Sequence, residues 1–139
     1  MTPLEREVRA KVYEMFLKGI HRVDASALVS QLDLGRDEIR IALEELAGEH
    51  RIALTSDGRV WMAHPFSGVP TPYLSVIGDR HWYANCAWDA LAILALLGDG
   101  VVRGQEGLLW QVEDGLVSPN GYVRLLVPAR SFWDDIGFT

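Results

Sequence analysis

The spacing of the apolar residues changes near residue 50, and this change limits the chain to folds that combine helices with a sheet. Between Leu4 and Gly48 the apolar side chains recur at helical spacing in three short segments. From Arg51 the spacing becomes alternating, and Ser56-Asp57-Gly58 separates two alternating segments as a hairpin turn would. Three helices followed by a hairpin are typical of a winged helix-turn-helix, so residues 1–63 are expected to form a winged-helix-like unit.

The second region, residues 64–139, is expected to contain strands and one apolar helix. Three prolines fall between Pro65 and Pro72, which predicts an extended and stiff connection after the hairpin. Gly98-Asp99-Gly100 would end the apolar helix. The expected elements are a strand at 73–77, a strand at 81–83, a helix at 84–97 and a meander of short strands from 101 onward.

The length and hydrophobicity of the chain set the size of its core. With 139 residues, 49% of them hydrophobic, the chain can bury one core or two small docked ones. We therefore expect an α+β fold in which the winged-helix-like unit packs on a small mixed or antiparallel sheet, with a buried helix that carries Cys86. The apolar run Ala84–Gly98 is shorter than the roughly 20 residues of a membrane-spanning helix, so no membrane partner is expected.

Charge and cysteine content narrow the possible partners and compartment. The formal net charge of −6 disfavours general binding to phosphate backbones or anionic lipids. The acidic N-terminal residues do not resemble an export signal. A single cysteine excludes an internal disulfide and fits the reducing cytoplasm, which is the expected location.

Cys86 and Asp89 stand three residues apart near the start of the apolar helix, a spacing that places their Cβ atoms about 5–6 Å apart on one face. A helix N-terminus would favour the thiolate form of Cys86. Desolvation by an apolar wall would favour the protonated form of Asp89. That wall would consist of Trp88, Leu91, Ile93 and Leu94. The spacing alone also allows a buried structural cysteine and a capping aspartate, which is the commoner situation.

Two segments of the chain carry a family resemblance. Residues 64–73 are His-Pro-Phe-Ser-Gly-Val-Pro-Thr-Pro-Tyr, and residues 82–98 are Trp-Tyr-Ala-Asn-Cys-Ala-Trp-Asp-Ala-Leu-Ala-Ile-Leu-Ala-Leu-Leu-Gly. In order and separation these segments resemble the core signature of the bacterial organomercurial (alkylmercury) lyases. The likeness extends to the N-terminal three-helix region, but only the central stretch is specific.

The resemblance implies protonolysis of a carbon–mercury bond, which gives a hydrocarbon and Hg(II). The family's catalytic cysteine and aspartate fall on Cys86 and Asp89. The thiolate of Cys86 would bind the soft mercury atom, and Asp89 would donate or relay the proton. No cofactor is expected, because mercury is bound only as substrate and product. Small thiols or a mercuric reductase would receive the Hg(II), in mercury resistance and detoxification.

The sequence departs from the family in its number of cysteines. The resemblance implies a second cysteine in the C-terminal part of the core, so that two thiolates coordinate the mercury. Cys86 is the only cysteine of the present sequence. Two explanations stay open. Either a family-typical segment beyond Thr139 is missing, as the apolar ending 131–139 suggests, or the chain is a divergent homologue with changed or lost activity. An alternative function is therefore a non-catalytic homologue that binds mercury or another metal.

A winged-helix regulator is the remaining alternative. The candidate reading helix, residues 36–50, contains five acidic residues and only two arginines, and would repel phosphates. DNA is thus not expected as a partner, and residues 1–63 are interpreted as a lid or as support for a homodimer.

Five further side chains are candidates for the surroundings of the site. His64 opens the proline-rich motif, and Asn85 would either orient Asp89 or cap the helix. The aromatic residues that would line a pocket for the organic group, or else pack in the core, are Tyr73, Trp82 and Trp88.

Overall fold

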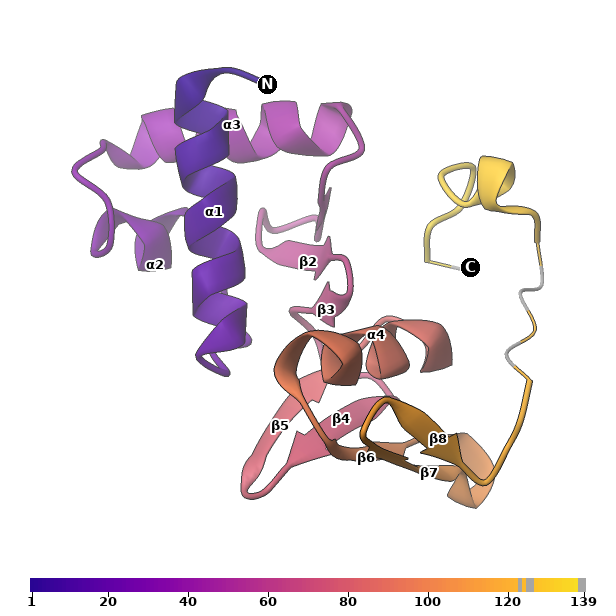
Figure 1. The fold of residues 1–139 in the computed structure, drawn as a ribbon. Coiled ribbons are helices and arrows are strands. Elements are labelled where there is room, and N and C mark those ends of the chain that lie inside the picture. The colour runs from indigo at the N-terminus through magenta and orange to yellow at the C-terminus, as the bar shows by residue number, and fades with distance from the viewer. Residues whose placement is uncertain (123, 125–126, 138–139) are drawn as a thin grey trace.

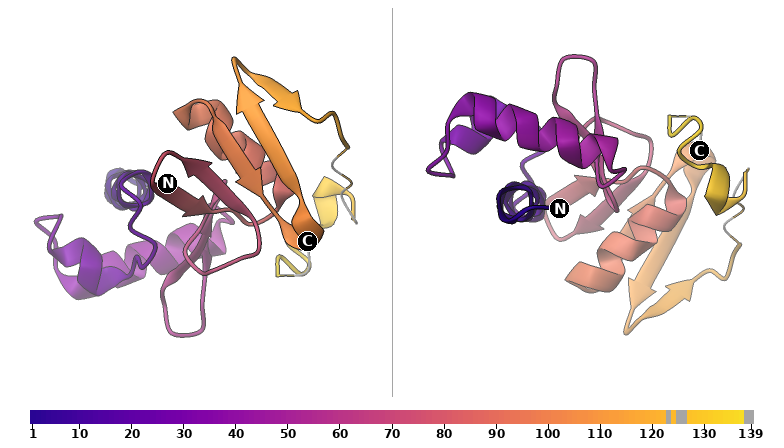
Figure 2. Two further views of the ribbon diagram at one scale, coloured as in Figure 1. Left: turned by 90° about the horizontal axis from the view of Figure 1, so that it is seen from below. Right: turned by 90° about the horizontal axis from the view of Figure 1, so that it is seen from above.

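The N-terminal part of the chain consists of three helices in the computed structural model, which describes residues 1–122, 124 and 127–137 (Figure 1). The helices are α1 (Pro3–Leu17), α2 (Ala25–Val29) and α3 (Arg36–Gly48). Thr2 and Glu5 form a capping box at the start of α1, and Asp24 caps α2. α1 crosses α3, and both helices bury their apolar faces (Figures 1 and 2). The three helices predicted from the apolar spacing are thereby confirmed.

A three-stranded antiparallel sheet follows α3. Its strands, in the order β1-β2-β3, are β1 (Ala53–Leu54), β2 (Val60–Ala63) and β3 (Phe66–Ser67). Pairing of Ala53 with Met62 confirms the predicted hairpin. Ala63 pairs with Phe66, so His64 and Pro65 form a two-residue turn inside the segment expected to be only an extended connection. The winged-helix description of residues 1–63 stays a prediction.

The second sheet has five antiparallel strands in the order β5-β4-β6-β7-β8. The strands are β4 (Leu74–Ile77), β5 (Arg80–Tyr83), β6 (Gly100–Arg103), β7 (Leu109–Glu113) and β8 (Leu116–Ser118). Between β5 and β6, helix α4 (Ala87–Leu97) lies on one face of this sheet, against β4 and β6 (Figure 2). The chain therefore returns beside β4 rather than beside β5. The α+β expectation is confirmed, with an antiparallel rather than a mixed sheet.

Two local predictions in this region were wrong. The apolar helix begins at Ala87 and not at Ala84, because Ala84 is still extended and forms a β-bridge with Phe66. The segment after β8 does not continue the meander within the described residues. It contains a short 3-10 helix, Ala129–Ser131, and then turns, although its apolar side chains suggested the start of a strand. Phe138 and Thr139 lie outside the described residues.

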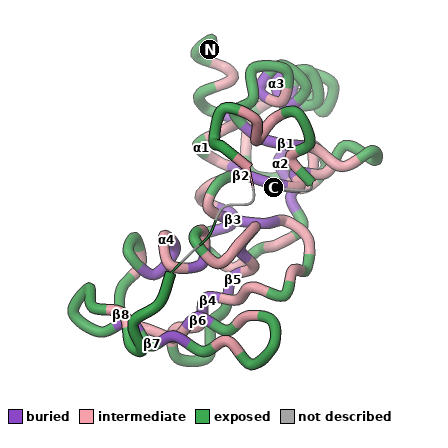
Figure 3. The backbone as a smooth tube through the Cα atoms, turned by 90° about the vertical axis from the view of Figure 1, so that its right-hand side faces the viewer, coloured by how far each residue is buried: buried purple, intermediate pink, exposed green. Residues whose placement is uncertain are grey.

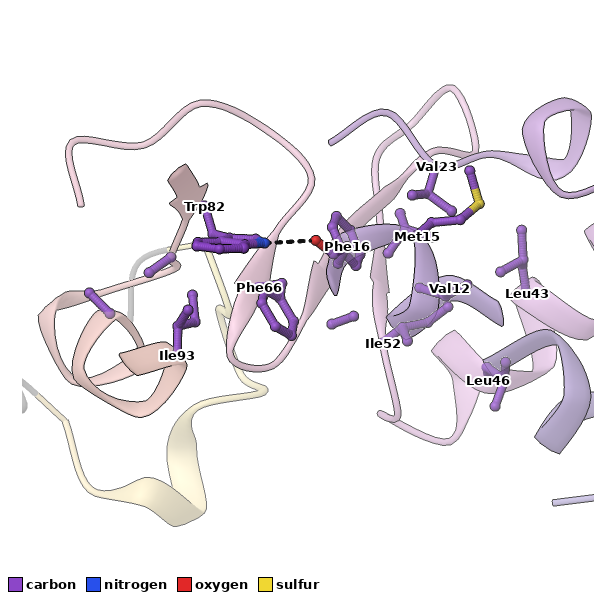
Figure 4. Packing of buried hydrophobic residues seen from close by; sticks show 14 of the residues in the cluster. Val12, Met15, Phe16, Val23, Leu43, Leu46, Ile52, Phe66, Trp82 and Ile93 are labelled. Carbon is purple, nitrogen blue, oxygen red and sulfur yellow. Dashed lines mark hydrogen bonds between the residues drawn. The ribbon is translucent and has the colours of Figure 1, made fainter. Parts of the chain in front are cut away.

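One apolar core joins the helical part to the five-stranded sheet. Backbone stretches with buried residues run from the helices through β2 and β3 to β5 and β4 (Figure 3). The Phe16 and Phe66 rings stack with centroids 5.8 Å apart, and Trp82 Nε1 donates a 2.9 Å hydrogen bond to the carbonyl oxygen of Phe16 (Figure 4). Among the described residues, no helix has the length and apolar character needed to cross a membrane.

Candidate active site

Cys86 occupies the N-cap position of α4. Its backbone is extended (φ −151°), and its Sγ accepts a 3.5 Å hydrogen bond from the backbone N–H of Asp89. Burial raises the pKa of the half-buried thiol, and the nearby Asp89 carboxyl adds to the rise. The N–H groups at the helix start act in the opposite direction but do not reverse it. The helix N-terminus therefore favours the thiolate form of Cys86 as expected, but desolvation outweighs this effect and leaves the pKa raised.

Asp89 lies in the first turn of α4, and its side chain is 14% exposed. Its Oδ2 accepts a 2.9 Å hydrogen bond from the Asn85 side-chain amide and lies 3.2 Å from His64 Nδ1. Of the apolar wall that was expected around the carboxyl, Trp88 lines the same cavity as Asp89, whereas Ile93 and Leu94 are buried in the core. Asn85 was expected either to orient Asp89 or to cap the helix. Its amide contacts the Asp89 carboxyl, and the N-cap of α4 is Cys86, so Asn85 has the orienting position.

His64 reaches the site from the turn between β2 and β3. Its carbonyl oxygen accepts a 3.0 Å hydrogen bond from the Tyr13 hydroxyl of α1, and its side chain is 43% exposed. Trp133 meets the imidazole edge-on, with centroids 6.4 Å apart. The sequence singled out His64 by its motif, but nothing in its spacing showed that it contacts Asp89.

These residues line a cavity of about 500 Å³, a size ordinary for small-molecule sites. Its polar wall is formed by His64, Asn85, Cys86 and Asp89, and its apolar wall by Met62, Trp88, Phe132, Trp133 and Ile136. Both walls and the thiol belong to this one cavity. A soft, thiol-seeking organic compound could thus meet the sulfur, a carboxyl group and an apolar surface together.

Of the aromatic residues proposed for the pocket, only Trp88 lines this cavity. Trp82 is buried in the core, and Tyr73 lines a different, more open cavity. Sequence reasoning missed Met62 of β2 and the wall contributed by the C-terminal segment. There, Trp133 stacks on His50 with centroids 4.4 Å apart. The apolar character of that segment was the only available signal, and it was interpreted as a coming strand.

A family model described as MerB, alkylmercury lyase, matches residues 66–103 of the chain. This span runs from β3 to β6 and includes both Cys86 and Asp89. The resemblance to the organomercurial lyase family is thereby confirmed over the central, specific part of the chain.

One solved structure that this chain resembles is the mercury-bound form of MerB2, which is among seven matching chains of solved structures. The TM-score is 0.66 and the sequence identity 20%, over 85% of this chain. The match covers 60% of the MerB2 chain, so the present chain spans less than two thirds of that chain. At this identity the likeness shows a shared fold. No curated protein matches the chain by sequence.

Proposed function

We propose that this chain cleaves the carbon–mercury bond of organomercurials by protonolysis. The observation that carries the proposal is that Cys86 and Asp89 lie together at one largely apolar cavity, with the Asp89 N–H bonded to the Cys86 sulfur. Soft sulfur is the ligand that a soft metal prefers. The family match over this segment supports the same chemistry.

The first step is capture of the metal. The raised pKa of Cys86 keeps the resting group as a thiol, so its proton must leave when the sulfur binds the mercury of R–Hg–X. The carboxylate of Asp89 is the adjacent base, and it takes this proton. The Hg–X bond breaks, X⁻ departs, and R–Hg–S(Cys86) remains with a protonated Asp89.

The second step is cleavage. Asp89 returns the proton to the carbon, which keeps the electron pair of the carbon–mercury bond, and R–H is released. Mercury stays Hg(II) throughout, so no oxidant or reductant is needed. A second thiolate, which a small external thiol can supply, ligates the mercury beside Cys86, the only cysteine of the present sequence. Exchange with small thiols then frees Cys86, and a mercuric reductase in the cytoplasm would complete detoxification.

The apolar wall suits the organic group. Trp88 has 61% of its surface exposed and lines the cavity, and Met62 lies at the same wall. Such surfaces bind hydrocarbon and exclude water from the reacting carbon.

The test incubates the protein with phenylmercury and excess thiol and measures the released benzene by gas chromatography. We expect benzene from the natural sequence and none from Cys86→Ser, which keeps the shape of the site. Asp79→Asn, a change in the exposed turn between β4 and β5, is a control that should keep full activity. Unchanged benzene release in Cys86→Ser would contradict the proposal.

A second candidate function is mercury binding without cleavage, and the single cysteine favours it. Stoichiometric uptake of Hg(II) with no hydrocarbon from any organomercurial would support this candidate. A regulator that binds DNA is less well supported, since the exposed surface of α3 carries four acidic side chains. These are Asp37, Glu38, Glu44 and Glu45. Arg40 on the same helix is already paired with Glu44.

A further inference from the structure

Both polar contacts of the Asp89 carboxyl use the same oxygen atom. The Asn85 amide donates to Oδ2 at 2.9 Å, and His64 Nδ1 lies 3.2 Å from that oxygen. Among the described residues, Oδ1 has no hydrogen-bond partner. The carboxyl is therefore fixed through one oxygen, and Asp89 also lines the cavity.

The proposed capture step needs Asp89 as an ionised carboxylate, and that form assigns the position of the proton on the His64 ring. An ionised carboxylate only accepts hydrogen bonds, so His64 Nδ1 must be the donor in its contact with Asp89. The Asn85 amide nitrogen lies 3.3 Å from the same Nδ1. Two donors cannot bond to each other, and the shorter contact of Asn85 goes to Asp89. Both groups thus act together on Oδ2.

His64 is itself held by separate parts of the fold. The Tyr13 hydroxyl fixes its backbone carbonyl from α1, and the guanidinium of Arg9 lies over the Tyr13 ring at 4.9 Å. Trp133 flanks the imidazole, and His50 stacks on Trp133. The groups that can carry charge around His64 are accordingly Asp89, Tyr13, Arg9 and His50. Of these, only Asp89 contacts the His64 ring.

We propose that His64 is a positioning residue for Asp89. Together with Asn85 it holds Oδ2, so that Oδ1 takes the proton from the Cys86 thiol and delivers it to the carbon that leaves mercury. This inference rests on the proposed lyase function, because it assigns His64 a role in that reaction. His64 touches neither the sulfur nor the substrate in this role and acts only through Asp89.

The activity test compares two replacements of His64. His64→Ala removes the donor, and we expect single-turnover benzene release to slow by about tenfold to a hundredfold, the range for a misplaced catalytic group. His64→Asn can keep a donor near the position of Nδ1 and should restore most of the rate. His81→Asn, on β5 and away from the cavity, is the matched control and should not change it. Phenylmercury should still bind one per chain in all three variants. A His64→Ala rate equal to that of the natural sequence would overturn the proposal.

A double-mutant test separates this inference from the lyase function. The pH dependence of Cys86 alkylation by iodoacetamide responds to the neighbouring carboxyl and needs no mercury chemistry. His64→Ala should shift the midpoint of that dependence when Asp89 is present, and should have no further effect in an Asp89→Asn background. The same shift in both backgrounds, or no shift in either, would overturn the positioning role. Coupling in a protein that releases no hydrocarbon would leave the positioning of Asp89 standing and remove the lyase proposal.

Discussion

Replacement of Trp82 by phenylalanine tests whether the helical part and the five-stranded sheet depend on one another. The indole is 2% exposed, and its Nε1 bonds to the Phe16 carbonyl oxygen. That oxygen keeps a second donor, the N–H of Gly19 at 2.8 Å, so it is not left unpaired by the change. The loss is therefore one hydrogen bond, about 1 kcal/mol net, and not the larger penalty for a buried unpaired group.

Packing adds a second loss of similar size. The smaller ring leaves a space of roughly 40 Å³, which costs about 1 kcal/mol at the usual dependence on cavity volume. We expect Trp82→Phe to lower the free energy of unfolding by about 2 kcal/mol. Urea unfolding followed by far-UV circular dichroism should show a lower midpoint with an unchanged slope.

Trp88→Phe is the matched control, because this indole is 61% exposed and lies outside the core. We expect it to change stability by less than about 0.5 kcal/mol. An equally small effect of Trp82→Phe would refute the reasoning. So would two separate unfolding transitions in that variant, since a shared core predicts that both parts unfold together.

Three further outcomes are expected. Asp89→Asn should still bind phenylmercury at Cys86 but release benzene at least about a hundredfold more slowly, as general acid–base contributions predict; full activity would show that the proton comes from another group. Because burial raises the pKa of Cys86, the thiolate is scarcer at neutral pH than in a free cysteine, so iodoacetamide should react more slowly with the folded than with the urea-unfolded protein. Gly100→Ala should lower the free energy of unfolding by about 1–3 kcal/mol, because the added Cβ would lie 2.3 Å from the Val76 carbonyl oxygen. At Gly48, by contrast, an added Cβ meets open space, so Gly48→Ala should raise the free energy of unfolding by up to about 1 kcal/mol. Urea unfolding measures both changes.

Several features could be predicted because they depend on short-range spacing. The three N-terminal helices and the β1–β2 hairpin follow from apolar periodicity and turn residues, and the structure confirms them. The proximity of Cys86 and Asp89 follows from their three-residue separation at a helix start, as the hydrogen bond between them shows.

The protonation of Cys86 could not be predicted in the same way. The helix N-terminus is visible in the sequence and favours a thiolate, but the burial that outweighs it depends on how the rest of the chain covers the sulfur. The same limit applies to the start of α4. Ala84 belongs to an apolar run that is typical of a helix, yet its backbone forms a β-bridge with Phe66. Local helix propensity cannot predict this contact, because Phe66 is distant in the sequence.

Residues a few positions apart were enough to predict the type of most elements and to bring Cys86 and Asp89 together as a candidate pair, since both depend on local spacing. Tertiary structure alone decided what surrounds that pair. It brought His64 to Asp89 across 25 positions, and it placed Trp133 beside both His64 and His50. Such contacts result from how a turn, a helix and a C-terminal segment pack on one core, and packing depends on the whole chain at once.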